Sequence, residues 1–144
     1  MIRMMLGFVA AVLSVLTFHQ GMWAVLHGAG MMPPAYQLTK VPPLGVPLLV
    51  DLCFWGGVWG AGFGLILSSV TGRSPLWVLG LALGVAAALV GMFVVPTLKG
   101  HAPSGLPPLG VWERSLLING SWGLGVGIIL PLLLQAVSRR RAVI

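Results

Sequence analysis

Charged residues are almost missing from this chain. Only 7% of its 144 residues are Asp, Glu, Lys or Arg, whereas 58% are hydrophobic, and the mean hydropathy is +1.02. A soluble domain carries about 25% charged residues, and a surface that faces water cannot be built from so few. The lack of charge therefore excludes a water-soluble globular protein and predicts that lipid surrounds most of the molecule.

Residues that carry chemistry are also scarce. The one cysteine, Cys53, excludes an intramolecular disulfide and a cysteine-based metal site. A haem held between helices needs paired ligands on facing helices, but His19 and His27 fall on one predicted helix. No G-x-S-x-G nucleophile motif and no phosphate-binding glycine loop occurs. We therefore expect no catalytic residues, no cofactor and no metal.

What the chain does contain is four long apolar segments, each close to the roughly 20 residues that cross a bilayer as a helix. Proline-rich loops and one short turn separate them, and proline ends helices. Together they use nearly the whole chain, which predicts one all-α membrane domain over residues 1–144. The predicted spans are residues 4–26, 46–70, 76–95 and 116–137.

The basic residues predict the orientation of these spans. Five lie on one side of the predicted membrane, namely Arg3, Arg73, Arg139, Arg140 and Arg141. Three lie on the other, namely Lys40, Lys99 and Arg114. The positive-inside rule makes the first side cytoplasmic, so both termini are expected there and both proline-rich loops in a bacterial periplasm. The net charge of +6 is thus explained by orientation and predicts no binding of nucleic acid.

An internal repeat is the most informative pattern. The pentapeptide PPLGV occurs at residues 42–46 and again at 107–111, and a W-G-x-G-x-G segment occurs at 59–64 and again at 122–127. Each copy belongs to one pair of spans, about residues 1–70 and 76–138. Because each copy contains two crossings, both copies have the same orientation, and the sequence predicts two parallel helical hairpins.

Small residues recur every four positions on three predicted helices. Such spacing lets helix backbones approach closely in lipid, where no hydrophobic force drives helices together. Packing within the chain is favoured over packing between subunits. The glycines are Gly56, Gly60, Gly64, Gly80, Gly84, Gly123 and Gly127. Beside them Trp55, Trp59 and Trp122 are interpreted as space-filling rings, with stacking on a substrate as the alternative.

Two groups of polar residues remain. Ser14, Thr17 and Gln20 recur at three-residue steps on the first span, which favours hydrogen bonding inside the bundle or a narrow polar path. The second group is expected together at the periplasmic side: His27, Asp51, His101, Glu113 and Arg114. Ion pairing, a site for a solute or lipid head group, and a zinc site from His27, His101 and a carboxylate are its three interpretations.

The segments FHQG at 18–21, PPLGVP at 42–47 and FWGGVWG at 54–60 resemble those of a family of small, uncharacterised proteobacterial inner-membrane proteins. The similarity extends through NGSWG at 119–123 and covers most of the chain. This resemblance implies a bacterial inner membrane as the setting, but it implies no activity and no residue roles.

Two functional hypotheses follow. The first is a non-enzymatic membrane protein, an accessory or scaffolding subunit that contacts lipid and assembles with itself or with a larger membrane complex. This hypothesis is based on the predicted interior of the bundle, which is rich in glycine and poor in reactive groups. The second is a small transporter or channel for a solute or ion, with a path along the repeat axis or an oligomer axis.

Overall fold

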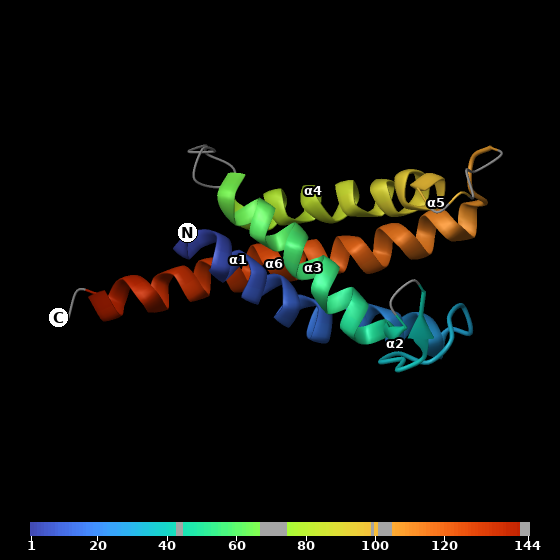
Figure 1. Ribbon diagram of the computed structural model, residues 1–144, viewed down its shortest axis with the longest axis horizontal. Coiled ribbons are helices and arrows are strands. Elements are labelled where there is room, and N and C mark those ends of the chain that lie inside the picture. The colour runs from blue at the N-terminus through green and yellow to red at the C-terminus, as the bar shows by residue number, and fades with distance from the viewer. Residues whose placement is uncertain (43–44, 67–74, 99, 101–104, 142–144) are drawn as a thin grey trace.

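The computed structural model describes residues 1–42, 45–66, 75–98, 100 and 105–141, and it consists mainly of four long helical rods (Figure 1). All four are long and apolar enough to cross a membrane, which confirms the prediction of an all-α bundle of membrane-spanning helices. The first rod is α1 (Ile2–Ser14), η1 (Val15–His19) and α2 (Gln20–Gly28), and the second is α3 (Leu48–Ile66). The third is α4 (Leu76–Leu89), η2 (Val90–Val94) and α5 (Val95–Leu98), and the fourth is α6 (Leu109–Arg141).

The bounds differ most at the fourth rod, where α6 begins at Leu109 rather than near residue 116. Its first turn directly follows Pro107 and Pro108 in the chain. The carbonyl of Pro108 accepts hydrogen bonds from the amides of Val111 (2.8 Å) and Trp112 (3.4 Å). Hydropathy alone misses this turn because the charged residues Glu113 and Arg114 follow it directly. The predicted end of the second span, residue 70, lies outside the described residues.

The rods pair as two hairpins. α1 packs along α3, and α4 packs along α6, while α1 also crosses α6 and joins the two pairs. Figure 1 shows the start of α1 and the end of α6 at one end of the bundle, and the end of α2 and the start of α6 at the other. The buried core lies where the hairpins meet, and its members are Ala10, Ala11, Val15, Phe63, Trp122, Val126 and Leu130.

Glycines bring the helices of the first hairpin into backbone contact. A Cβ atom added at Gly60 would clash with the carbonyl oxygen of Gly7 and the side chain of Ala11. One added at Gly64 would clash with the carbonyl oxygen of Arg3. Such contacts supply the dispersion energy that replaces hydrophobic attraction between helices in lipid.

The second hairpin has the same kind of contact. A Cβ atom added at Gly80 would clash with the carbonyl oxygen of Gly123, and one added at Gly123 would clash with that of Gly80. Gly84 lies against the carbonyl oxygen of Asn119, and Gly127 packs on the backbone of Leu76. Gly60 and Gly123, which each follow the tryptophan of the repeated segment, thus lie at the crossing of their own hairpin.

The first rod of each hairpin contains a π-helical turn, η1 or η2. Such turns insert a residue into the helix, and they are frequent at functional sites. In η2 the cause is visible, because Pro96 follows at once and has no backbone N–H to donate to the preceding turn. The hydroxyl of Thr97 donates to the carbonyl of Phe93 at 2.7 Å. In η1 the carbonyl of Leu16 instead accepts a hydrogen bond from the loop that connects the first two rods.

That loop connects the first two rods and folds back over the first. Its tip carries a two-stranded antiparallel sheet, β1 (Lys40–Val41) with β2 (Val46–Pro47), which the all-α prediction does not include. Tyr36, in the left-handed region at φ 55°, donates its hydroxyl to the carbonyl of Leu16 at 2.9 Å. The loop is therefore fastened to the middle of the first rod.

Candidate functional site

A cavity of about 120 Å³ lies between the two hairpins. Val15, Gly56 and Ala87, which help to line it, lie near the middle of their rods. The two closest helix pairs, α1 with α3 and α4 with α6, each lie within one hairpin. These contacts therefore do not fill the space between the hairpins. Trp55 borders the cavity and is 55% exposed, which places an opening on the lipid-facing surface. The remaining lining residues are His19, Leu52, Trp59, Asn119 and Trp122.

His19 is the most deeply buried polar group of this cavity, with 6% of its surface exposed. The hydrogen bonds around it determine which ring nitrogen of His19 carries the proton. Gln20 accepts the backbone N–H of Tyr36 at 2.7 Å with Oε1, so its Nε2 faces His19 Nδ1 at 3.3 Å and donates to it. An imidazole whose Nδ1 accepts is neutral and carries its proton on Nε2.

The Nε2–H of His19 has no hydrogen-bond partner within the described part of the chain. In that part, no fully enclosed side-chain nitrogen or oxygen lacks a partner, so this nitrogen must reach open space. His19 is one of the residues that line the cavity, and we infer that this is the open space that its Nε2–H faces. The other side of the imidazole contacts the ring of Trp23, with ring centroids 5.9 Å apart.

Asn119 provides the complementary group from α6. Its Nδ2 donates to the carbonyl of Ser115 at 2.9 Å, and because a carbonyl can only accept, this bond fixes the orientation of the amide. Oδ1 is left as an acceptor without a partner among the described residues. Two residues of the cavity lining, one from each hairpin, thus carry a donor and an acceptor without a partner among the described residues, and three tryptophans line the same cavity.

Beside the cavity, at Trp122, two hydrogen bonds tie the hairpins together. The hydroxyl of Ser14 donates to the carbonyl of Trp122 at 2.6 Å, and the indole Nε1 of Trp122 donates to the carbonyl of Ala11 at 3.1 Å. Trp122 is 3% exposed. A Cβ atom added at Gly56 would approach Val15 at 2.7 Å and the Trp122 indole nitrogen at 3.5 Å, so this glycine helps to leave the space open.

The residues of the predicted polar path do not lie together along one channel. Ser14 and Gln20 are buried and are used in bonds within the chain, whereas Thr17 is exposed and bonds to the carbonyl of Leu13 at 2.7 Å. The π-helical turn explains the difference, since a residue inserted between Ser14 and Gln20 rotates the helix face by about 100° relative to an unbroken 3.6-residue period. His19 is brought to the interior by the same turn.

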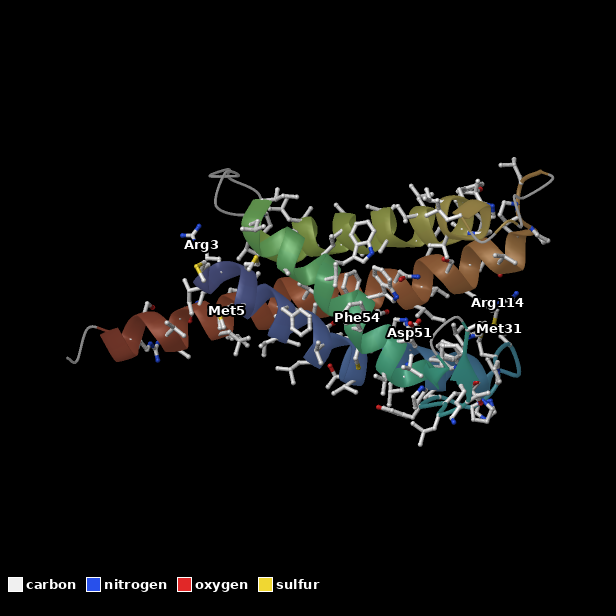
Figure 2. The ribbon with its side chains drawn as sticks, viewed as in Figure 1. Arg3, Met5, Met31, Asp51, Phe54 and Arg114 are labelled. Carbon is white, nitrogen blue, oxygen red and sulfur yellow. The ribbon has the colours of Figure 1, made fainter. Side chains whose placement is uncertain are left out.

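Four of the five polar residues predicted for the loop end lie in the described part of the chain, and there they form no ion pair and no metal cluster with one another. The exposed His27 pairs its Nδ1 with the carbonyl of Met32 at 2.8 Å. Figure 2 shows Asp51 near the first turn of α3 and Arg114 near the start of α6, with Arg3 at the opposite end. Among the described residues no ion pair joins Asp51 or the exposed Glu113 to a basic side chain, and no metal-binding cluster occurs. His101 lies outside the described residues.

Sequence reasoning missed the cavity. It placed His19 outside the polar face of the first span and assigned no role to Asn119 or Gly7. The tryptophans were the available signal, since stacking on a ligand was the alternative to core packing. All three tryptophans line the cavity, while Trp122 also belongs to the buried core and Trp59 packs against that core.

Comparison of the chain with protein-family models, with curated proteins and with solved structures gives no match. The geometry of the cavity is therefore the basis for a functional conclusion.

Proposed function

We propose that this chain is a non-enzymatic accessory protein of a bacterial inner membrane that holds a membrane-borne molecule between its two hairpins. The observation that carries the proposal is the mid-span cavity lined by His19 and Asn119, whose Nε2–H donor and Oδ1 acceptor have no partner among the described residues. Ligand sites are mostly apolar cavities with a few convergent polar groups. The exposed Trp55 gives a lipid-dissolved molecule direct access from the bilayer.

A binding role is favoured over catalysis because the other polar groups of the core are engaged. Ser14 and Trp122 bond across the hairpins, and Gln20 bonds to Tyr36 and His19. Among the described residues that line the cavity, none pairs a nucleophile with a base, the usual arrangement for covalent catalysis. A protein that only holds a molecule acts by presenting it to something else, which motivates the accessory role in a homo-oligomer or a larger membrane complex.

Orientation and origin belong to the same proposal. The end that carries Arg3 and Arg139 is assigned to the cytoplasm and the end that carries Lys40 and Arg114 to the periplasm, by the positive-inside rule. Duplication of an ancestral hairpin is supported by the matched glycine contacts, because Gly60 and Gly123 follow equivalent tryptophans and both lie at a crossing.

The binding role is tested by extracting the protein in a lipid-retaining polymer and analysing the bound small molecules by mass spectrometry. We expect one compound to be enriched over bulk lipid in the wild type and lost from Ala87→Phe, whose ring fills the cavity from α4. Gly91→Ala is the matched control on the same rod, since a Cβ there meets nothing within 4 Å. Equal lipid profiles in all three proteins would refute the binding role.

The accessory role is tested separately by purifying the tagged protein at natural abundance in a gentle detergent. We expect copies of itself or fixed partner chains to co-purify. Recovery of a lone monomer would contradict this part of the proposal.

A small transporter is the second candidate, because the cavity lies at mid-span, where a substrate site would be expected. A transporter requires that the cavity can open to both sides of the membrane. A cysteine placed at Leu52 in a Cys53→Ser background tests it with a membrane-impermeant maleimide applied from each side. Labelling from both sides would favour transport, and protection from both sides would favour holding.

A further inference from the structure

We infer that the molecule held in the cavity is a lipid-soluble quinol, bound by a hydroxyl of its aromatic ring. The inference rests on the proposed function and names the ligand class of that site. It is drawn from the size of the cavity, the side chains that line it, and the two hydrogen-bonding atoms that it presents.

The size of the cavity sets the size of the bound group. A dry cavity of roughly 150 Å³ is enough for benzene, so about 120 Å³ with an open side accommodates one ring and leaves the rest of the ligand outside. Since the exposed Trp55 marks the opening toward lipid, the part outside is an apolar tail. A ring on an apolar tail is therefore the shape that fits.

The walls favour an aromatic ring. Trp55 and Trp59 line the α3 side of the cavity and Trp122 lines its α6 side. Offset or edge contacts between aromatic rings contribute about 0.5–1.5 kcal/mol beyond simple burial. An acyl chain of a phospholipid would gain no such contact and would leave the N–H of His19 and the Oδ1 of Asn119 unpaired in an apolar place, which is unfavourable.

The two polar atoms select the oxidation state of the ring. His19 Nε2–H can only donate and Asn119 Oδ1 can only accept, so the ligand must both accept and donate a hydrogen bond. A quinol hydroxyl does both. A quinone carbonyl can accept from His19 but has no hydrogen to give to Asn119. The site is thus complementary to the reduced ring, and the oxidised ring leaves one partner unsatisfied.

Titration calorimetry of the full chain in lipid nanodiscs, under argon, tests this with three matched ligands: decylhydroquinone, decylbenzoquinone and decylbenzene. We expect decylhydroquinone to bind most tightly, decylbenzoquinone about three- to tenfold more weakly for one lost hydrogen bond, and decylbenzene weakest of all. Asn119→Leu should remove the preference for the reduced ring. His19→Phe should weaken both oxygenated ligands by about three- to tenfold and leave decylbenzene unchanged.

His27→Gln is the matched control for His19→Phe, since His27 lies on the same rod, bonds to Met32 and does not line the cavity. Helical content measured by circular dichroism identifies any variant that fails to fold, and the comparison of three ligands on the wild-type protein needs no variant. If all three ligands bind equally, the quinol inference is wrong while the binding role stands. If none binds and Ala87→Phe changes nothing, both are wrong.

Discussion

The two hairpins are held together internally in the same way, but they differ in what their polar groups do. In both, a glycine that follows a tryptophan brings two backbones together, at Gly60 in the first and at Gly123 in the second. The first hairpin adds Ser14, His19 and Gln20, which bond to the other hairpin, to each other or to the loop. In the second hairpin, Thr97 and the Asn119 amide nitrogen bond within their own rod, and the indole N–H of Trp122 bonds across to the first hairpin.

The difference teaches that close packing and polar bonding have separate tasks here. Packing through glycine forms each hairpin, because dispersion is the main attraction between helices in lipid. The polar bonds between distant parts of the chain lie where the hairpins meet and where the loop returns to the first rod. Variants that disrupt glycine packing and variants that remove a polar bond, made in one hairpin at a time, should therefore change the stability of the bundle by different amounts.

The largest effect is expected from Gly60→Ala and Gly123→Ala, because the added methyl group meets backbone atoms that cannot move aside. We expect each to lower the free energy of unfolding by about 2–3 kcal/mol, measured by titration with sodium dodecyl sulfate in mixed micelles. In Gly62→Ala the methyl group meets nothing within 4 Å, so stability should hold or rise slightly. Equal losses at Gly60 and Gly62 would refute the crossing geometry.

A smaller difference, of about 1–2 kcal/mol in the free energy of unfolding, should separate alanine variants of the two tryptophans of the repeated segment. Trp122 is a core residue with a hydrogen bond to Ala11, whereas Trp59 is half-buried beside the cavity. We expect Trp122→Ala to destabilise the bundle by about 2–3 kcal/mol and Trp59→Ala by about 1 kcal/mol. The same detergent titration measures both. A larger loss for Trp59→Ala than for Trp122→Ala would mean that packing inside the first hairpin, and not packing between the hairpins, contributes most to stability.

The smallest effect concerns the two π-helical turns. Tyr36→Phe removes the bond from the loop to the Leu16 carbonyl in η1, and Thr97→Val removes the local bond to Phe93 in η2. Each bond contributes about 0.6 kcal/mol in a membrane protein. Hydrogen–deuterium exchange should speed up about threefold over the loop around Tyr36 in the first variant and stay unchanged there in the second. Faster loop exchange in Thr97→Val would show that the turns are not independent.

The repeated pentapeptide shows how far sequence similarity predicts local structure. In the copy at 107–111, Leu109, Gly110 and Val111 begin α6. In the copy at 42–46, Gly45 has φ 65° and Val46 is in β2, while residues 43–44 lie outside the described part. The same letters thus begin a helix in one place and continue into a strand in the other. Glycine permits both backbone conformations, and the following residues decide between them.

The candidate site was predictable only in its ingredients. Tryptophans beside glycines and a histidine in an apolar span are visible in the sequence, but a regular helical period places His19 away from Ser14 and Gln20. The π-helical turn at Val15–His19 changes that register. No proline or other residue in that segment signals the turn, in contrast to Pro96 after η2. Asn119 becomes a candidate only when α6 is placed beside the first hairpin.

Composition determined that this is a helical membrane protein, because a chain with so few charges and four long apolar segments can satisfy its backbone in lipid only by forming helices. The spacing of its glycines determined which faces could approach closely. Only the tertiary structure decided which helices pair, how η1 turns His19 inward, and that a ring-sized space stays open between the hairpins. Those features depend on contacts between residues about a hundred positions apart, such as Ser14 with Trp122, and local sequence carries no record of them.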